Sequence, residues 1–204
     1  MSRQRTRLLV ATHNKGKLAE YQELLADLEA TFIDLDSAGI GWDVEETGKS
    51  FEENAVLKAK TYAGASGLLT LADDSGLEVD ALGGKPGVRT ARFGGPGLNA
   101  VERYQLLLQK LADVPWEERG ARFRCVVALA SPSGLLRTSS GTIEGRIASE
   151  PSGSEGFGYD PVFVVLQEQV TMAQLPAAVK NRISHRARAL EALRPHLEAL
   201  LADK

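Results

Sequence analysis

The order of apolar segments predicts an α/β fold around a mixed β-sheet. In the first third of the chain, short apolar runs alternate with helical patterns, which is typical of parallel strands joined by helices. Two longer alternating stretches follow, over residues 121–130 and 135–147, and the Ser-Pro-Ser-Gly turn between them indicates an antiparallel pair. The 204 residues are enough for one large domain, or for two lobes that share a core.

The individual elements follow from local patterns. Residues 8–11 are apolar and precede the polar residues 12–17, after which leucines and a tyrosine recur at helical spacing up to Leu28. Residues 32–35 predict a second strand. Further along, the patterns predict a helix that is capped by Ser50 and Glu53 and ends at Gly64 and Gly67. A strand over 68–72, a turn over 73–76, a half-buried strand over 77–81 and a long loop over 83–97 are predicted next, followed by a helix capped by Asn99. The last predicted elements are a glycine-rich loop over 153–161, a strand over 162–166, and helical structure from Thr171 that Pro176 and Pro195 interrupt.

Composition predicts a globular protein of the cytoplasm. Hydrophobic residues make up 43% and charged residues 25%, and no apolar run is long enough to cross a bilayer. The basic residues 1–7 lead into an apolar run that is too short for a signal peptide. Cys125, the only cysteine, is expected on a core strand, and the three histidines have no zinc-ligand spacing with it. The net charge of −3 gives no general attraction to nucleic acid.

The polar loop over residues 12–17 is a candidate phosphate site. A loop that enters a helix offers backbone N–H groups where the helix dipole favours anions. This loop also carries Thr12, Asn14, Lys15 and Lys17, which supply hydroxyl, amide and ammonium donors. The spacing of a P-loop is absent, and an ordinary solvated connection with two surface lysines explains the same residues.

Two pairs of neighbouring carboxylates are candidate metal ligands. Asp73 and Asp74 follow an apolar strand directly, at the strand end where α/β sheets commonly place ligands. Adjacent carboxylates in a turn repel each other unless a cation or donors relieve them, and magnesium prefers such oxygen ligands. Glu45 and Glu46 form the second pair, ahead of a helix. A turn cap beside a solvated carboxylate explains the first pair equally well, and a solvated loop explains the second.

A glycine-rich segment and a basic segment complete the candidates. Phe157 and Tyr159 lie among glycines, where aromatic rings stack on a base or, as often, fill the core beneath the loop. Residues 180–186 form a basic cluster before a leucine-rich helix, for which Ser184 is a candidate N-cap. The cations of this cluster are suited to bind a phosphate or a base oxygen. A solvated helix face or a weak RNA-binding surface explains the same residues.

Seven motifs follow one another along the chain in a fixed order. They are Thr12-x-Asn14-x-x-Lys17, Glu45-Glu46-Thr47-Gly48 with Ser50-Phe51-x-Glu53-Asn54-Ala55, Ala72-Asp73-Asp74-Ser75-Gly76-Leu77, Gly83-Gly84-x-Pro86-Gly87, Ala91-Arg92-Phe93, Gly156-Phe157-Gly158-Tyr159-Asp160-Pro161 and Ser184-His185-Arg186. In this order, they resemble the motifs of the inosine triphosphate pyrophosphatase family. The resemblance covers about residues 8–190 and departs from the family in two places, because His13 stands where many relatives have glycine and Thr90 where they often have serine.

The resemblance implies a magnesium-dependent homodimer that hydrolyses ITP, dITP and XTP to the monophosphate and pyrophosphate. It implies one pyrophosphatase domain over residues 1–204, with an elongated, two-lobed α/β fold around a long mixed sheet flanked by helices and an active-site cleft between the lobes. By motif, Asp74 is expected to accept the proton of the attacking water and to bind Mg²⁺ together with Glu45. The expected substrate-binding residues are Thr12, His13, Asn14, Lys15, Gly16, Lys17, Ser75, Phe157, Gly158, Tyr159, Asp160, Lys180, His185 and Arg186.

Base selectivity is expected to come from hydrogen bonding. Hypoxanthine and xanthine present an acceptor oxygen at position 6, which backbone N–H groups of the glycine-rich loop or Arg186 can meet, whereas the amine of adenine would face donors. No stable nucleic-acid partner and no membrane are expected. Three alternatives stay open: a Maf-like pyrophosphatase with another base preference, a nucleotide sensor that binds without hydrolysis, and an RNA-binding protein that uses the basic residues 180–194.

Overall fold

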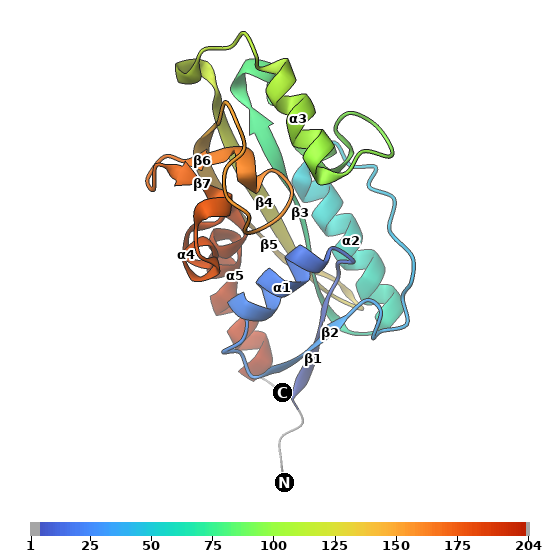
Figure 1. The fold of residues 1–204 in the computed structure, drawn as a ribbon. Coiled ribbons are helices and arrows are strands. Elements are labelled where there is room, and N and C mark those ends of the chain that lie inside the picture. The colour runs from blue at the N-terminus through green and yellow to red at the C-terminus, as the bar shows by residue number, and fades with distance from the viewer. Residues whose placement is uncertain (1–4, 203–204) are drawn as a thin grey trace. The chain divides into compact units, whose positions relative to one another are not determined.

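The computed structural model describes residues 5–202 and contains a seven-stranded sheet with the order β2-β1-β3-β4-β5-β6-β7 (Figure 1). β1 pairs in parallel with β2 and β3, whereas β6 pairs antiparallel with β5 and β7. The predicted mixed sheet is therefore confirmed. The strands are β1 (Thr6–Val10), β2 (Ala30–Asp34), β3 (Leu69–Val79), β4 (Gly120–Ser131), β5 (Gly134–Ile147), β6 (Phe163–Val165) and β7 (Val170–Thr171).

Helices flank this sheet, and their ends carry the predicted caps. Ser50 accepts a hydrogen bond from Glu53 N at the start of α2, and Asn99 forms a full capping box with Glu102 at the start of α3. None of the helices within residues 5–202 is long and apolar enough to cross a membrane. The helices are α1 (Lys15–Leu24), α2 (Phe51–Ser66), α3 (Ala100–Lys110), α4 (Ala177–Ile183) and α5 (His185–Ala202). The first part of the basic segment 1–7, residues 1–4, lies outside the described residues.

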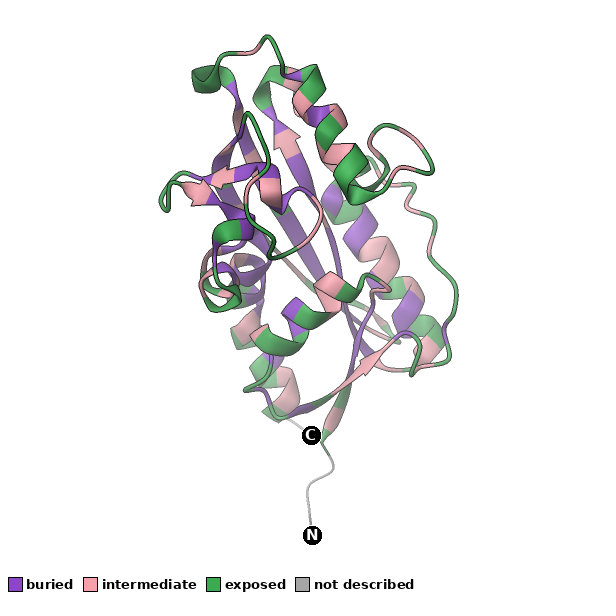
Figure 2. Ribbon diagram, viewed as in Figure 1, coloured by how far each residue is buried: buried purple, intermediate pink, exposed green. Residues whose placement is uncertain are grey.

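The chain forms two compact units, each with its own hydrophobic core. Of the described residues, 5–74, 125–141 and 186–202 form unit 1, and 75–124 and 142–185 form unit 2. The core of unit 1 packs leucines of β1, α1 and α5 against β3 and β4, and Cys125 is fully buried within it, as predicted. The core of unit 2 joins α3 to β4, β5 and β6. Figure 2 shows the buried central strands and the exposed outer surfaces of the helices. The single-domain assignment stays a prediction.

The turn predicted over residues 73–76 is wrong, because β3 runs unbroken from Leu69 to Val79. Pairing of β3 with a neighbour on each side satisfies its backbone, so the chain has no need to turn. Successive side chains of a strand point to opposite faces of the sheet. Asp73 and Asp74 are therefore separated by the pleat of a strand, and mutual repulsion does not have to be relieved by a turn.

Three other local predictions also differ from the structure. Gly64 lies inside α2, and only Gly67, in a left-handed conformation, ends that helix. Pro195 lies inside α5 and does not interrupt it, since buried leucines on either side, Leu193 and Leu197, hold both halves in the core. The loop predicted over residues 83–97 contains a 3₁₀ segment, Gly87–Arg92.

Candidate active site

Asp73 faces the side of β3 that α1 and α5 cover in unit 1. Its Oδ2 accepts hydrogen bonds from Lys17 Nζ at 2.9 Å and from Arg186 Nη2 at 3.3 Å, and Arg186 also pairs with Glu20 of α1. Burial alone would raise the pKa of Asp73, but Lys17 and Arg186 outweigh it and hold that pKa well below its usual range. Asp73 is therefore a buried, permanently charged carboxylate that fixes two cations.

Asp74 faces the opposite side, toward α2. Asn54 Nδ2 donates to its Oδ2 at 2.9 Å, and Lys58 Nζ lies 3.8 Å from its Oδ1. Burial raises the pKa of Asp74, Glu46 raises it further, and Lys58 only partly offsets the two. A carboxylate with a raised pKa is a stronger base than a free aspartate, so this position suits proton acceptance from water.

Lys58 also brings a second carboxylate to the Asp74 side. Its ammonium donates to Glu46 Oε1 at 2.6 Å, so Glu46 and Asp74 share one cationic group. Glu45, the residue predicted as a metal ligand, is exposed on the same segment. Within residues 5–202 no three His, Cys, Asp or Glu side chains are grouped to hold a metal. Two hard carboxylates beside each other nevertheless fit Mg²⁺, which binds through one or two carboxylates plus water and substrate phosphates.

The predicted phosphate loop leads into α1, with Asn14 as the N-cap of the helix. Thr12 Oγ1 accepts a hydrogen bond from Asn14 N, and Asn14 Oδ1 accepts one from Lys17 N, so these two side chains shape the loop. His13 reaches the segment that carries the glutamates: its Nδ1 donates to Asp43 at 2.8 Å and its Nε2 to the Ile40 carbonyl at 3.0 Å. Lys15 and Gly16 begin the helix itself, with Lys15 exposed.

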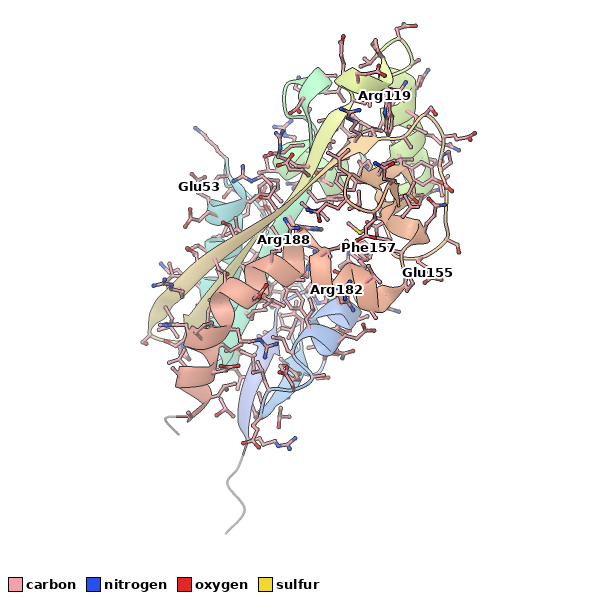
Figure 3. All side chains as sticks on the ribbon, turned by 90° about the vertical axis from the view of Figure 1, so that its left-hand side faces the viewer. Glu53, Arg119, Glu155, Phe157, Arg182 and Arg188 are labelled. Atoms are coloured by element: carbon pink, nitrogen blue, oxygen red, sulfur yellow. The ribbon has the colours of Figure 1, made fainter. Side chains whose placement is uncertain are left out.

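The glycine-rich loop of unit 2 holds a second charged group. Asp160 is buried, accepts from Phe157 N at 2.9 Å, and pairs with Lys180 Nζ at 2.5 Å. The same ammonium lies 4.7 Å from the centre of the Phe157 ring. Figure 3 shows Phe157 and Glu155 on this loop, and Arg182 on α4. Gly156 has φ +75°, and a Cβ there would collide with the Asp160 carboxylate, so the loop requires glycine at this position.

Four further residues predicted to bind substrate also lie in unit 2. Tyr159 is buried in its core, and its hydroxyl donates to the Thr90 carbonyl at 3.1 Å, so only the backbone of Tyr159 remains for a ligand. The Tyr159 ring therefore fills the core beneath the loop, which is one of the two roles expected for the aromatic residues of this segment. The His185 ring stacks on Phe123, with centres 5.0 Å apart. Ser75 is half-buried on β3, and Gly158 has φ +63°.

The structure thus distributes the predicted residues over both units. Unit 1 holds the 12–17 loop, Glu45, Asp74 and Arg186, and unit 2 holds Ser75, the 157–160 segment, Lys180 and His185. The expected cleft and the residue roles stay predictions. Arg186, expected to reach a base oxygen, is 1% exposed and bonded to two carboxylates, so its side chain supports Asp73.

The sequence alone did not identify Glu20, near Asp73, or Lys58, near Asp74, as residues of the site. Glu20 follows Lys17 by three positions and Lys58 follows Asn54 by four, which puts each pair on one helix face. That spacing is the only local signal, and solvated helix faces show it as well.

These features are an α/β fold and clusters of buried charged side chains at the candidate site, and comparison with known proteins shows the family. The chain belongs to the Ham1 family, whose model matches residues 8–196. It is 51% identical to the dITP/XTP pyrophosphatase of Geobacter sulfurreducens over 192 residues, which are 94% of this chain and 96% of that protein. It is 44% identical to the dITP/XTP pyrophosphatase of Bacillus subtilis over 191 residues, again 94% of this chain and 96% of that protein.

A solved structure supports the fold independently. The structure of a HAM1 protein from Coxiella burnetii matches with a TM-score of 0.84 and 43% identity, over 98% of this chain and 100% of that one. The predicted α/β class and the predicted family are both confirmed.

Proposed function

We propose that this chain hydrolyses dITP, XTP and ITP to the nucleoside monophosphate and pyrophosphate, with Mg²⁺ as the cofactor. The names of its relatives support the reaction and the substrate class. The observation that carries the residue roles is the contrast within β3, where Asp73 is held ionised by cations and Asp74 has a raised pKa. Neighbouring carboxylates with such different environments are typical of a divided catalytic task.

In this proposal the Asp74 carboxylate accepts a proton from the water that attacks the α-phosphorus. Asn54 orients that carboxylate through its Nδ2 hydrogen bond. Bound Mg²⁺, held by Asp74 with Glu45 or Glu46, would supply charge neutralisation for the phosphates. The assignment of Glu45 comes from the family resemblance, whereas the position of Glu46 beside Lys58 favours Glu46 as a second candidate ligand.

Cations and backbone donors bind the triphosphate. Lys17 is held by Asp73 at the first turn of α1, where backbone N–H groups also favour anions. In unit 2, Lys180 and the loop around Phe157 supply a cation and an aromatic face for the nucleotide. The homodimer and the cytoplasmic location that the resemblance implies belong to the same proposal, and sedimentation at several protein concentrations tests the first.

A substrate panel tests this function directly. The protein is incubated with each nucleoside triphosphate, with and without Mg²⁺, and pyrophosphate is measured separately from phosphate. We expect pyrophosphate from ITP, dITP and XTP, only with metal, and little from ATP. Preference for another base would favour a Maf-like enzyme, and binding without pyrophosphate release would favour a sensor.

A further inference from the structure

One face of α2 follows the segment that carries the two glutamates. Asn54, Lys58 and Tyr62 are spaced by four residues, so their side chains lie in one row along the helix. Each of them contacts the segment over residues 42–48. All of these residues belong to unit 1.

The contacts advance in a regular register. Tyr62 meets Val44, Lys58 meets Glu46, and Asn54 meets Gly48, with distances of 3.1, 2.6 and 2.8 Å. Four residues of helix rise about 6 Å, and two residues of extended chain span about 6.6 to 6.8 Å. The spacing of the helix row therefore matches that of every second residue in the segment. The residues between these contacts, including Glu45, are exposed, whereas Val44 and Glu46 are half-buried.

The contact at Gly48 shows how closely the two elements approach. A Cβ at Gly48 would lie 2.5 Å from Asn54 Oδ1, so a larger residue there would displace the amide that bonds both Gly48 N and Asp74. The register is thus fixed at one end by a close approach that only glycine allows.

Tyr62 fixes the other end of the register. Its side chain is 2% exposed, its hydroxyl accepts from Val44 N at 3.1 Å, and the same hydroxyl donates to the Trp42 carbonyl at 3.3 Å. The Trp42 ring stacks on the Tyr62 ring, with centres 5.3 Å apart and planes 27° apart. Tyr62 thus satisfies the hydrogen bonding of two backbone groups of the segment, as pairing with a neighbouring strand would. Its ring also packs against the one aromatic ring of the segment.

We propose that Tyr62 is a positioning residue that holds residues 42–46 against α2 and thereby sets the affinity of the Asp74 side for a divalent cation. The inference rests on the proposed Mg²⁺-dependent function. The Tyr62 hydroxyl bonds to the backbone of Trp42 and Val44, so it acts through the backbone on either side of Asp43. If this anchor is lost, Glu46 keeps its carboxylate but no longer has a fixed position at the Lys58 ammonium that it shares with Asp74.

The test uses Tyr62→Phe, which keeps the ring under Trp42 and removes only the hydroxyl. Tyr104→Phe, on α3 of unit 2, is the matched control because it removes a hydroxyl from a half-buried tyrosine elsewhere. Mn²⁺ affinity is measured by electron paramagnetic resonance on the protein without nucleotide, and the Mg²⁺ concentration for half-maximal pyrophosphate release is measured separately. Circular dichroism melting of both variants checks that they fold.

The Tyr62 hydroxyl makes two hydrogen bonds, and loss of one alone is worth about two- to tenfold. We therefore expect Tyr62→Phe to weaken Mn²⁺ binding, and to raise the half-saturating Mg²⁺ concentration, by at least about two- to tenfold. Excess Mg²⁺ should restore kcat, amide hydrogen exchange at Val44 should accelerate, and Tyr104→Phe should change none of these. Unchanged Mn²⁺ affinity in folded Tyr62→Phe would overturn the inference, as would a kcat loss that excess metal does not rescue. If the wild-type protein releases no pyrophosphate, the proposed function fails, while the Mn²⁺ measurement still decides the role of Tyr62.

Discussion

The two faces of β3 place neighbouring aspartates in opposite electrostatic surroundings. On the α1 and α5 face, Asp73 meets Lys17 and Arg186, and its pKa is lowered despite burial. On the α2 face, Asp74 meets an amide, one shared ammonium and a second carboxylate, and its pKa is raised. The two residues are of the same type and are similarly buried, so their pKa values differ because different elements supply the neighbouring charges. These elements are α1 and α5 for Asp73, and α2 with the segment that carries Glu46 for Asp74.

The comparison shows how one strand supports two tasks. A carboxylate surrounded by cations keeps its charge and is a poor base, but it positions the cations. A carboxylate that is desolvated and faces another carboxylate binds a proton or a metal ion more readily. Alternation along the strand is enough to separate the two roles, and substitutions at Asp74 and Arg186 test that separation.

The largest effect is expected for Asp74→Asn. This change removes the base while keeping the shape of the side chain, and kcat should fall by about 10²- to 10⁴-fold, with further loss if metal is released. The measurement is pyrophosphate release from ITP at saturating Mg²⁺. Near-normal turnover would contradict the role given to the α2 face.

Arg186→Met tests the other face and should act first on stability. The change leaves Asp73 and Glu20 buried without their guanidinium, and breaking a buried pair in this way costs about 3–5 kcal/mol in the free energy of unfolding. Urea denaturation measures it. Arg194→Met on the same helix is the control, because Arg194 pairs with the exposed Asp27 and should cost about 1 kcal/mol or less. Equal losses in the two variants would refute the proposed role of Arg186.

Phe157→Ala extends the comparison to the glycine-rich loop of unit 2. Its ring faces the Lys180 ammonium and is only half-buried, so we expect KM for ITP to rise more than kcat falls if the ring stacks on the base. Steady-state kinetics at several ITP concentrations separate the two constants. A variant altered only in melting temperature would instead assign Phe157 to packing.

The smallest effect is expected at His13. Both of its ring nitrogens face acceptors, Asp43 and the Ile40 carbonyl, so this geometry requires the protonated imidazole. The hydrogen bond that His13 donates to Asp43 raises the pKa of His13 above 6.5, the value expected for the unfolded chain. The stabilisation is therefore complete below pH 6.5 and is lost as pH rises through the higher folded pKa.

Comparing the unfolding free energy of His13→Gln with that of the wild type across pH 5 to 9 measures this contribution. Because Asp43 is exposed, the difference should be about 1 kcal/mol or less at low pH and should shrink at high pH. A difference that grows with pH would contradict the assigned protonation state.

The sequence by itself determined the α/β class, most strands and helices, and the caps at Ser50 and Asn99. These depend on apolar periodicity and on hydrogen bonds between residues a few positions apart. The family followed from the resemblance that the ordered motifs carry. The sequence also pointed to Asp74 as the candidate base, through the ordered motifs around it. It could not show that β3 continues through Asp74, because the polar run resembles a turn until neighbouring strands pair with it.

Only the tertiary structure decided which charges meet. Arg186 bonds to Asp73 across 113 positions of sequence, and Lys17 bonds to the same carboxylate across 56. Likewise, the contacts of Asn54, Lys58 and Tyr62 with residues 42–48 decide that Glu46 shares an ammonium with Asp74. Local sequence carries no information about such partners, because the partner of a buried charge is set by how helices pack on the two faces of the sheet.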